Sequence, residues 1–351
     1  MKIISKSYKK IISFFFLFLY GKISFKKINL NKDFTVKKKI FKNRFYKFFE
    51  INKCRIYTNT SDVAYIKNNL IISGPSIQLR DNYNQHVKHN VVIKKGTPKF
   101  YKKINYRVFS LLCGVDANNN YYHWFFDCLP KFLLFSKFYN FNKNDFFLLP
   151  NLKHDYQIQS LKILKIKNIL NGYDLKHIKA KKIISLNFFY TINHQDWLIQ
   201  SLRKKFILSK KKTKKPTLKI FINREGINSL TRDIFEKEKL IKFLKKNNFL
   251  LINPSKLSFI DEVKLFNSAK IVIGVHGAAL TNVIFCQNKT HIIELKNNKS
   301  DYLYENIIKK SKLNHYSLVS KKITSNSSSR SCDGLIEVNL LKLSKILSNI
   351  K

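Results

Sequence analysis

Residues 270–285 have the sequence KIVIGVHGAALTNVIF, which predicts a buried strand, a glycine-bracketed turn and the start of a helix. The β-branched run at 270–274 favours the strand, and Gly274 and Gly277 allow a tight turn before a helix over 278–285. Because the first N–H groups of a helix lack partners within it, such a turn suits a phosphate. The alternative is an ordinary strand-to-helix connection of an α/β domain, with His276 as a locally satisfied loop histidine.

The segments around this turn alternate between strand and helix patterns. We expect strands at 218–223, 249–252, 270–274 and 291–295, with helices at 234–246 and from 258 onward. Asp233 with Glu236, and Ser258 with Asp261, have the spacing of capping boxes. The alternation predicts a parallel sheet, in which ligands bind beyond the carboxyl ends of the strands. The glycine spacing differs from G-x-G-x-x-G, so a nicotinamide or flavin dinucleotide is not expected.

The chain is strongly basic, with a formal net charge of +46 over 351 residues. Of its 67 basic residues only 8 are arginine, and Asn, Ile, Phe and Tyr are abundant, which indicates a bias toward A/T-rich codons. A nucleic-acid surface would contain more arginine, so nucleic acid is not the expected partner. The charge still favours anionic membranes, glycans and nucleotide-linked substrates. A basic polyanion or nucleic-acid binder without catalysis remains the main alternative, and its binding would weaken steeply with salt.

The five cysteines show neither C-x-x-C spacing nor a zinc-ligand pattern. We therefore expect reduced, buried thiols in a cytoplasmic protein. The apolar run 11–20, IISFFFLFLY, is flanked by lysines but is too short to span a bilayer, which requires about 20 residues. It fits a weak signal segment, an interfacial anchor on the inner face of the membrane, or a buried strand or helix of the first domain.

A lysine-rich run at 210–216, KKKTKKP, is the predicted linker between two domains. Residues 1–209 form the first domain, of which 1–100 are strand-rich and carry no recognisable motif. Residues 217–323 form the second domain, followed by a Ser/Asn-rich flexible loop at 324–334 and a final helix at 335–351.

Two of the few arginines follow the strand at 218–223. Arg224 stands directly at its end and Arg232 lies eight residues later. Planar guanidinium groups at the edge of a parallel sheet suit a pyrophosphate, because each donates two hydrogen bonds in fixed geometry. The alternative is surface pairing with Glu225, Asp233 or Glu236.

The segment 118–135, NNNYYHWFFDCLPKFLLF, places His123 and Asp127 four residues apart. On a helix started by the asparagines they would share one face, and Pro130 should kink or end that helix. A histidine and a carboxylate held together in this way can act as a general base for a hydroxyl. The alternative is a core helix in which Asp127 fixes the tautomer of His123.

Several motifs occur together in a defined order. They are NYYHWFFDCLP at 120–130, IFINRE at 220–225 with TRDI at 231–234, LSFIDEVKLFNSAKIVIGVHGAALTN at 257–282, and IIEL at 292–295. This set resembles glycosyltransferase family 61, the DUF563-type proteins linked to capsule or lipopolysaccharide synthesis. The resemblance covers about residues 105–297.

The resemblance implies an α/β fold of the GT-B-like kind, with two Rossmann-type domains whose parallel sheets face across a cleft. The H-W-x-x-D element of the family falls on His123, Trp124 and Asp127, and its S-R strand end falls on Asn223 and Arg224. The family's later arginine pair is represented by Arg232 alone, beside Thr231. Its H-G-A-x-L-T-N element and its E-L strand end fall on the following residues: His276, Gly277, Ala278, Leu280, Thr281, Asn282 and Glu294.

These matches imply inverting transfer of a sugar from a nucleotide-diphosphate donor, with UDP expected first, to a glycan hydroxyl. The diphosphate would lie on the helix start after Gly277, with Arg224 and Arg232 offsetting its charge. Glu294 would accept the ribose hydroxyls. Asp127 would be the base and His123 its alternative.

No D-x-D motif occurs in the chain, so we expect metal-independent transfer without a cofactor. The glycan acceptor would be free or lipid-linked. A further alternative is a different nucleotide-sugar enzyme, such as an epimerase, which would need no acceptor.

Overall fold

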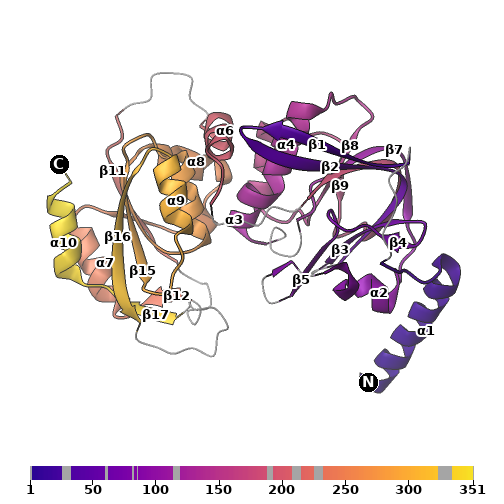
Figure 1. The fold of residues 1–351 in the computed structure, drawn as a ribbon. Coiled ribbons are helices and arrows are strands. Elements are labelled where there is room, and N and C mark those ends of the chain that lie inside the picture. Colours follow the sequence, from indigo (N-terminus) through magenta and orange to yellow (C-terminus); the bar gives the residue numbers. More distant parts are fainter. Residues whose placement is uncertain are drawn as a thin grey trace. The chain divides into compact units, whose positions relative to one another are not determined.

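The chain divides between residues 190 and 191 into two units, Met1–Tyr190 and Thr191–Lys351 (Figure 1). The computed structural model describes residues 2–25, 33–59, 62–80, 83–84, 86–113, 119–187, 193–207, 215–224, 232–322 and 334–350. Helix α6 (Asp196–Phe206) therefore belongs to the second unit, although it precedes the lysine-rich run expected to be the linker. Arg203 of α6 donates to the carbonyl of Ile284 at 2.9 Å, which explains why this helix packs with the second unit. Residues 208–214 lie outside the described part of the chain.

The second unit contains a sheet with the strand order β12-β17-β16-β15-β14-β11-β13. All neighbouring strands in it run parallel except β16 and β17. Its strands are β11 (Leu218–Ile222), β12 (Arg232–Ile234), β13 (Leu250–Ile252), β14 (Ala269–Val275), β15 (His291–Asn297), β16 (Asn314–Lys322) and β17 (Gly334–Glu337). The predicted parallel sheet of this part of the chain is confirmed.

The order of its central strands follows a doubly wound pattern, β13-β11-β14-β15-β16. The chain first adds β13 on one side of β11 and then returns to add β14, β15 and β16 on the other side. The strand order therefore reverses between β11 and β14. Ligands of such sheets bind at this reversal, outside the carboxyl ends of the two strands.

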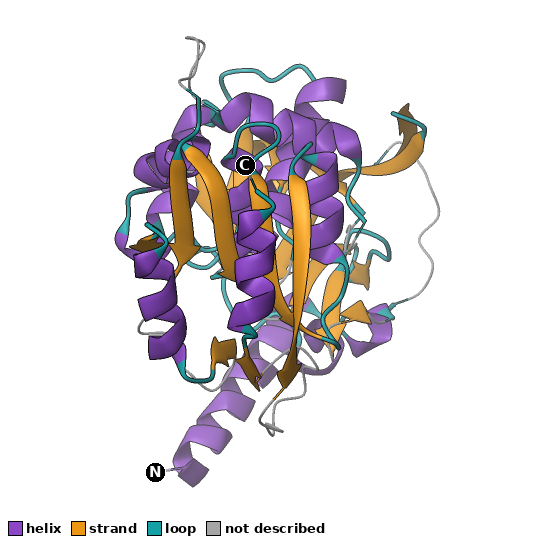
Figure 2. Cartoon of the chain, turned by 90° about the vertical axis from the view of Figure 1, so that its left-hand side faces the viewer, coloured by secondary structure: helices purple, strands orange, loops and turns teal. Residues whose placement is uncertain are grey.

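Helices cover both faces of this sheet. Helices α7 (Lys237–Lys246) and α10 (Leu340–Ser348) lie on one face, and Figure 2 shows the strands from that side. Helices α6, α8 (Phe259–Asn267) and α9 (Leu303–Lys310), with the 3-10 helix η5 (Ala278–Phe285), lie on the other face. On this second face Phe206, Phe259 and Phe285 pack edge to face, which ties α6, α8 and η5 together.

The first unit contains a mixed sheet with the path β6-β5-β3-β2-β10-β7-β8-β9. Its neighbours β10, β7, β8 and β9 run parallel, whereas β1, β2, β3, β5 and β6 pair antiparallel. The strands are β1 (Phe34–Phe41), β2 (Arg44–Thr58), β3 (Asp62–Lys67), β4 (Leu70–Ile71), β5 (Ile77–Arg80), β6 (Tyr83–Asn84), β7 (Lys102–Ser110), β8 (Phe146–Leu149), β9 (Ile169–Asn171) and β10 (His177–Leu186). The parallel sheet expected for this domain is thus present only as part of a mixed one.

Helices connect the parallel strands of the first unit. A helical segment runs through α3 (Tyr121–His123), the π-helical turn η3 (Trp124–Cys128) and α4 (Leu129–Phe138) between β7 and β8, and α5 (Asp155–Ile163) connects β8 to β9. The other helices in the described part of this unit are α1 (Lys2–Tyr20), η1 (Val87–His89) and α2 (Val91–Lys95). The mixed α/β class expected from the sequence is confirmed.

Local capping was predicted correctly in one of two helices. Ser258 caps α8, and its hydroxyl accepts from the N–H of Asp261 at 3.2 Å. The prediction for Asp233 is wrong, because this residue lies in β12, which pairs with β17, and α7 begins only after Glu236. The final helix likewise starts later than expected, since residues from Gly334 first form β17.

The apolar run 11–20 forms the second half of helix α1. Among the residues that the structure describes, no helix is long and apolar enough to cross a bilayer. The described cysteines, Cys54, Cys113, Cys128 and Cys286, are buried free thiols, and Cys332 lies outside the described residues.

Candidate functional site

The carboxyl ends of β11 and β14 bring two predicted site segments to the strand reversal. Strand β11 ends at Ile222 and is followed by Asn223 and Arg224, while β14 leads into His276 and Gly277. The Asn223 N–H donates to the carbonyl of Ile252 at 2.7 Å, and the His276 N–H donates to the carbonyl of Leu295 at 2.8 Å. These bonds fix both strand ends to their neighbours, so the start of η5 and Arg224 leave the sheet at adjacent points.

The turn after β14 depends on close packing at Gly274. A Cβ atom on this glycine would lie 3.0 Å from Cδ2 of Leu280 and 3.1 Å from Cδ1 of Ile222. Glycine therefore lets η5 pack directly against the strand ends. The Gly277 backbone is extended, so this residue is not needed for a left-handed conformation.

The helical segment after the turn is a 3-10 helix rather than the predicted α-helix opening. Its hydrogen bonding begins with the Leu280 N–H and the Gly277 carbonyl, 2.9 Å apart. The N–H groups of Ala278 and Ala279 precede this first bond, and both residues are half-buried. These two backbone groups are the ones that an anion at the turn would meet.

Three other residues of this motif point inward in the fold. Leu280 and Thr281 are fully buried and Asn282 is almost so. The Asn282 amide donates to the Ala279 carbonyl at 3.3 Å. These residues pack on the inner side of the turn and fix the position of its backbone.

His276 belongs to a buried cluster that joins three elements. Its Nδ1 lies 2.6 Å from Glu294 of β15, whose second carboxylate oxygen lies 3.0 Å from Nε2 of His315 on β16. Tyr304 of α9 packs edge to face on the His276 ring, with centroids 5.1 Å apart. Because Nδ1 is held by the carboxylate, Nε2 of His276 is the nitrogen directed toward other groups, and Asp301 lies 3.7 Å from it.

The sequence led us to expect that Glu294 contacts the ribose, but in the structure it is buried against two histidines. Its side chain has no exposed surface and both of its oxygens are engaged by histidines. Burial opposes ionisation of this carboxyl, but the hydrogen bonds from His276 and His315 outweigh it and lower its pKa to about 2. The geometry therefore makes Glu294 a positioning residue for His276. His315 was missed by sequence reasoning, since its partner lies on a neighbouring strand.

Arg224 is half-buried at the strand reversal, and its carbonyl accepts from the Lys237 ammonium at 3.4 Å. The same ammonium lies 3.3 Å from Asp233, the residue after Arg232. The structure describes only the backbone of Arg232, which begins β12. Thr231 and Glu225 lie outside the described residues. Lys237 thus links the start of α7 to the end of β11.

The first unit places His123 and Asp127 together as the sequence predicted. The Asn120 side chain caps the helix by accepting from the N–H groups of Tyr122 and His123, at 2.9 and 3.4 Å. His123 Nδ1 and Asp127 Oδ2 lie 2.5 Å apart. The His123 side chain is 14% exposed and that of Asp127 only 3%, so the imidazole is the more accessible member of the pair.

Pro130 neither ends nor breaks this helix. The chain widens into the π-helical turn η3, in which the Leu129 N–H bonds to the Trp124 carbonyl, and Pro130 occupies the first turn of α4. A widened turn removes the clash that a proline ring makes with the carbonyl four residues earlier. The Trp124 indole N–H donates to the Ser160 hydroxyl at 2.9 Å and anchors the turn to α5.

Lys131 follows Asp127 by four residues, as Asp127 follows His123, and it was missed by sequence reasoning. It is 1% exposed, and its ammonium donates to the carbonyl of Leu112, two residues beyond the end of β7. Burial lowers its pKa. The spacing of His123, Asp127 and Lys131 at steps of four was the available signal.

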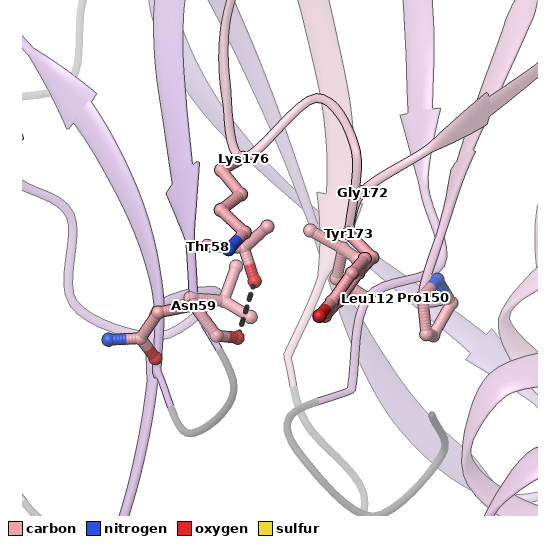
Figure 3. Close-up of a pocket in the computed structure, with 8 residues that line it drawn as sticks. Thr58, Asn59, Leu112, Pro150, Gly172, Tyr173 and Lys176 are labelled. Atoms are coloured by element: carbon pink, nitrogen blue, oxygen red, sulfur yellow. Dashed lines mark hydrogen bonds between the residues drawn. The ribbon is translucent and has the colours of Figure 1, made fainter. Parts of the chain in front are cut away.

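A small cavity lies at the carboxyl ends of the parallel strands in the first unit (Figure 3). Thr58, Leu112, Pro150 and Gly172 contribute to its wall. Its volume is about 10 Å³, which is near the minimum for a single water molecule, so it is too small for a sugar. Among the described residues, no cluster of three His, Cys, Asp or Glu side chains suited to a metal ion is found.

The model of the family described as Glycosyltransferase 61 matches residues 121–293. This match supports the resemblance to glycosyltransferase family 61 that the sequence motifs indicate. The match begins at the first residue of α3 and ends inside β15, so it includes His123, Asp127, Arg224 and the turn at Gly277. Glu294 follows directly after the matched stretch. No curated protein matches the chain.

Proposed function

We propose that this protein is an inverting glycosyltransferase that moves a sugar from a nucleotide-diphosphate donor to a glycan hydroxyl, in cell-surface polysaccharide synthesis. The match to the family 61 model supports a sugar-transferring enzyme. The observation that carries the finer proposal is the strand reversal of the second unit, where Arg224 and the turn at Gly277 adjoin. This is the position where doubly wound sheets bind nucleotides.

The donor diphosphate would bind at the second unit. The N–H groups of Ala278 and Ala279 would donate to its oxygens, and Arg224 and Arg232 would balance the charge that grows on the leaving nucleotide. His276, oriented by Glu294, would present Nε2 to the same anion. UDP is the first nucleotide to test.

The base would come from the first unit. The acceptor hydroxyl loses its proton as its oxygen attacks the anomeric carbon, while the bond from that carbon to the diphosphate breaks on the opposite face. The exposures favour His123 as the group that receives the proton, with Asp127 holding the imidazole from behind. Asp127 was the base expected from the sequence, and the roles are separated by comparing Asp127→Asn with His123→Ala.

We propose that the transfer needs neither a metal nor a cofactor. The chain has no D-x-D sequence, and arginine and backbone N–H groups can take over the charge balance that a divalent cation supplies elsewhere. Transfer measured with and without a chelator tests this directly. Loss of activity on chelation, restored by Mg²⁺ or Mn²⁺, would contradict it.

A screen of nucleoside diphosphates by thermal unfolding is the first experiment. A bound nucleotide raises the melting temperature in proportion to the logarithm of its saturation. Stabilisation by UDP that Arg224→Ala abolishes would support the proposal. Product analysis by NMR then determines the anomeric configuration, and retention would contradict a single displacement.

The net charge of +46 favours a second candidate, a polyanion binder without catalysis. Its binding would fall steeply with salt and would survive Arg224→Ala. Release of an altered nucleotide sugar in the absence of acceptor would instead indicate an epimerase.

A further inference from the structure

Helix α1 carries two apolar stripes, and unit 1 covers only one of them. The covered stripe contains Ser13, Phe16 and Tyr20, at the spacing of one helical face. Ser13 donates to the Lys95 carbonyl at 3.0 Å, Phe16 packs on Phe100 with ring centroids 4.9 Å apart, and the Tyr20 hydroxyl accepts from the Tyr101 N–H at 3.4 Å.

These contacts hold the carboxyl half of α1 firmly to the start of β7 and to α2. The Arg55 guanidinium lies 5.2 Å over the Tyr20 ring, and His177 meets the same ring edge to face. Figure 1 shows α1 beside α2 at the edge of the first unit, with its amino end directed away from the sheet. The carboxyl half of the helix is therefore a fixed part of the unit.

The second stripe contains Ile11, Phe14, Phe15 and Phe18, again at helical spacing, and it faces solvent. Phe14 is 75% exposed, Phe18 88% and Ile11 68%. Together the three phenylalanines expose on the order of 400 Å² if a whole aromatic side chain offers about 200 Å². Apolar patches of this size on a soluble surface are commonly interaction sites.

The sequence segments that contribute to this face of the unit carry charge of a single sign. Residues 1–32 contain eight lysines and no Asp or Glu, and residues 82–115 contain six lysines, one arginine and no Asp or Glu. Lys10 and Lys22 on either side of the stripe are exposed, as are Lys94 and Lys95 of α2. A second copy of this chain would bring like charges together, whereas an anionic surface would meet only opposite charge.

We propose that the exposed stripe of α1 docks on the surface of a bilayer that contains anionic lipids. The phenylalanines enter the boundary between headgroups and acyl chains, and the surrounding lysines contact the headgroup phosphates. The helix lies along the surface, with its exposed stripe toward the acyl chains and its lysines at the level of the headgroups. Docking holds the first unit at the membrane and would bring it near lipid-linked molecules.

Vesicle sedimentation of the full chain tests this proposal. The probe is a vesicle of phosphatidylcholine and phosphatidylglycerol in equal amounts, compared with phosphatidylcholine alone. The variants are Phe14→Ser with Phe18→Ser, and the matched control is Phe45→Ser, which alters a phenylalanine of β2 that is 69% exposed. We expect binding to the anionic vesicles to fall about tenfold or more for each phenylalanine of α1 replaced, and to be unchanged in the control.

Charge-reversal variants test the electrostatic contribution to vesicle binding. Lys94→Glu with Lys95→Glu should weaken binding several-fold at low salt, and the difference should shrink as salt is added. Equal binding to neutral and anionic vesicles, or equal losses in the Phe45 control, would overturn the proposal. Vesicle binding is measured without donor or acceptor, so its outcome is independent of the proposed transfer reaction.

Other occupants of the stripe give distinct results. Protein that resists extraction from vesicles by alkaline carbonate would indicate insertion, which contradicts surface docking. A dimer that Phe14→Ser and Phe18→Ser dissociate, in a protein that does not sediment with vesicles, would indicate a second copy and would also overturn the proposal.

Discussion

The two units each hold a histidine against a carboxylate, but they build the pair by different means. His123 and Asp127 are four residues apart on one helical segment, whereas His276 meets Glu294 from a neighbouring strand and His315 from the next. Asp127 serves one histidine and Glu294 serves two. The difference is consistent with the separate tasks proposed above, which are proton transfer for the first pair and a fixed contact with a phosphate for the second.

The largest effect on activity is expected when the pair of His123 and Asp127 in the first unit is broken. His123→Ala should lower kcat by about 10²–10⁴, the usual contribution of a general base, with little change in UDP binding. Steady-state kinetics measure kcat, and titration calorimetry measures UDP affinity. His89→Ala, which alters an exposed histidine of the same unit, should leave both unchanged. Equal activity of the His123 and His89 variants would remove His123 from the mechanism.

Arg224→Ala alters the proposed diphosphate site of the second unit and should reduce both activity and UDP binding. We expect kcat/KM to fall about 100- to 1,000-fold, because one preorganised donor to the leaving group is lost. UDP affinity should fall as well, which distinguishes this variant from His123→Ala. Arg44→Ala, at an exposed position of β2, is the control. Wild-type affinity for UDP in the Arg224 variant would contradict the placement of the diphosphate.

Glu294→Gln tests the histidine–carboxylate cluster of the second unit through the pH dependence of stability. The folded-state pKa of Glu294 is about 2, below its ordinary value of 4.5, so its ionisation stabilises the fold above pH 4.5. That contribution is on the order of 3 kcal/mol, and it is lost as the pH falls from 4.5 toward 2. Urea unfolding across this window should show a flatter pH dependence in the variant. An unchanged profile would show that the cluster does not hold the carboxylate ionised.

The smallest effect is expected at the turn itself. Gly274→Ala should destabilise the fold by about 1–3 kcal/mol, because the new methyl group meets Leu280 and Ile222. In the double variant with Leu280→Ala, the contact at 3.0 Å is gone, so the two costs should be less than additive. Strict additivity in thermal unfolding would show that Gly274 and Leu280 are not in close contact.

Features set by local spacing could be predicted from the sequence. The pairing of His123 with Asp127 follows from four-residue spacing, and the Ser258 cap follows from the residues beside it. The parallel sheet of the second unit follows from the alternation of strands and helices. The first two depend on neighbours within one helical turn, and the third depends on the local pattern of each strand and helix in succession.

Features set by contacts between distant segments could not be predicted in this way. Asp233 has the sequence of a helix cap but lies in a strand, because β17, about a hundred residues later in the chain, pairs with it. Glu294 looks like an exposed strand end until His315 is placed beside it by the register of β15 and β16. The antiparallel half of the first sheet likewise arises from pairing of strands whose sequences match no recognised motif.

A crystal structure of the protein with UDP would test the central claim most directly. The account predicts the diphosphate at the strand reversal of the second unit, within hydrogen-bond distance of the Ala278 N–H and the Arg224 guanidinium. A diphosphate bound elsewhere on the protein would contradict the account.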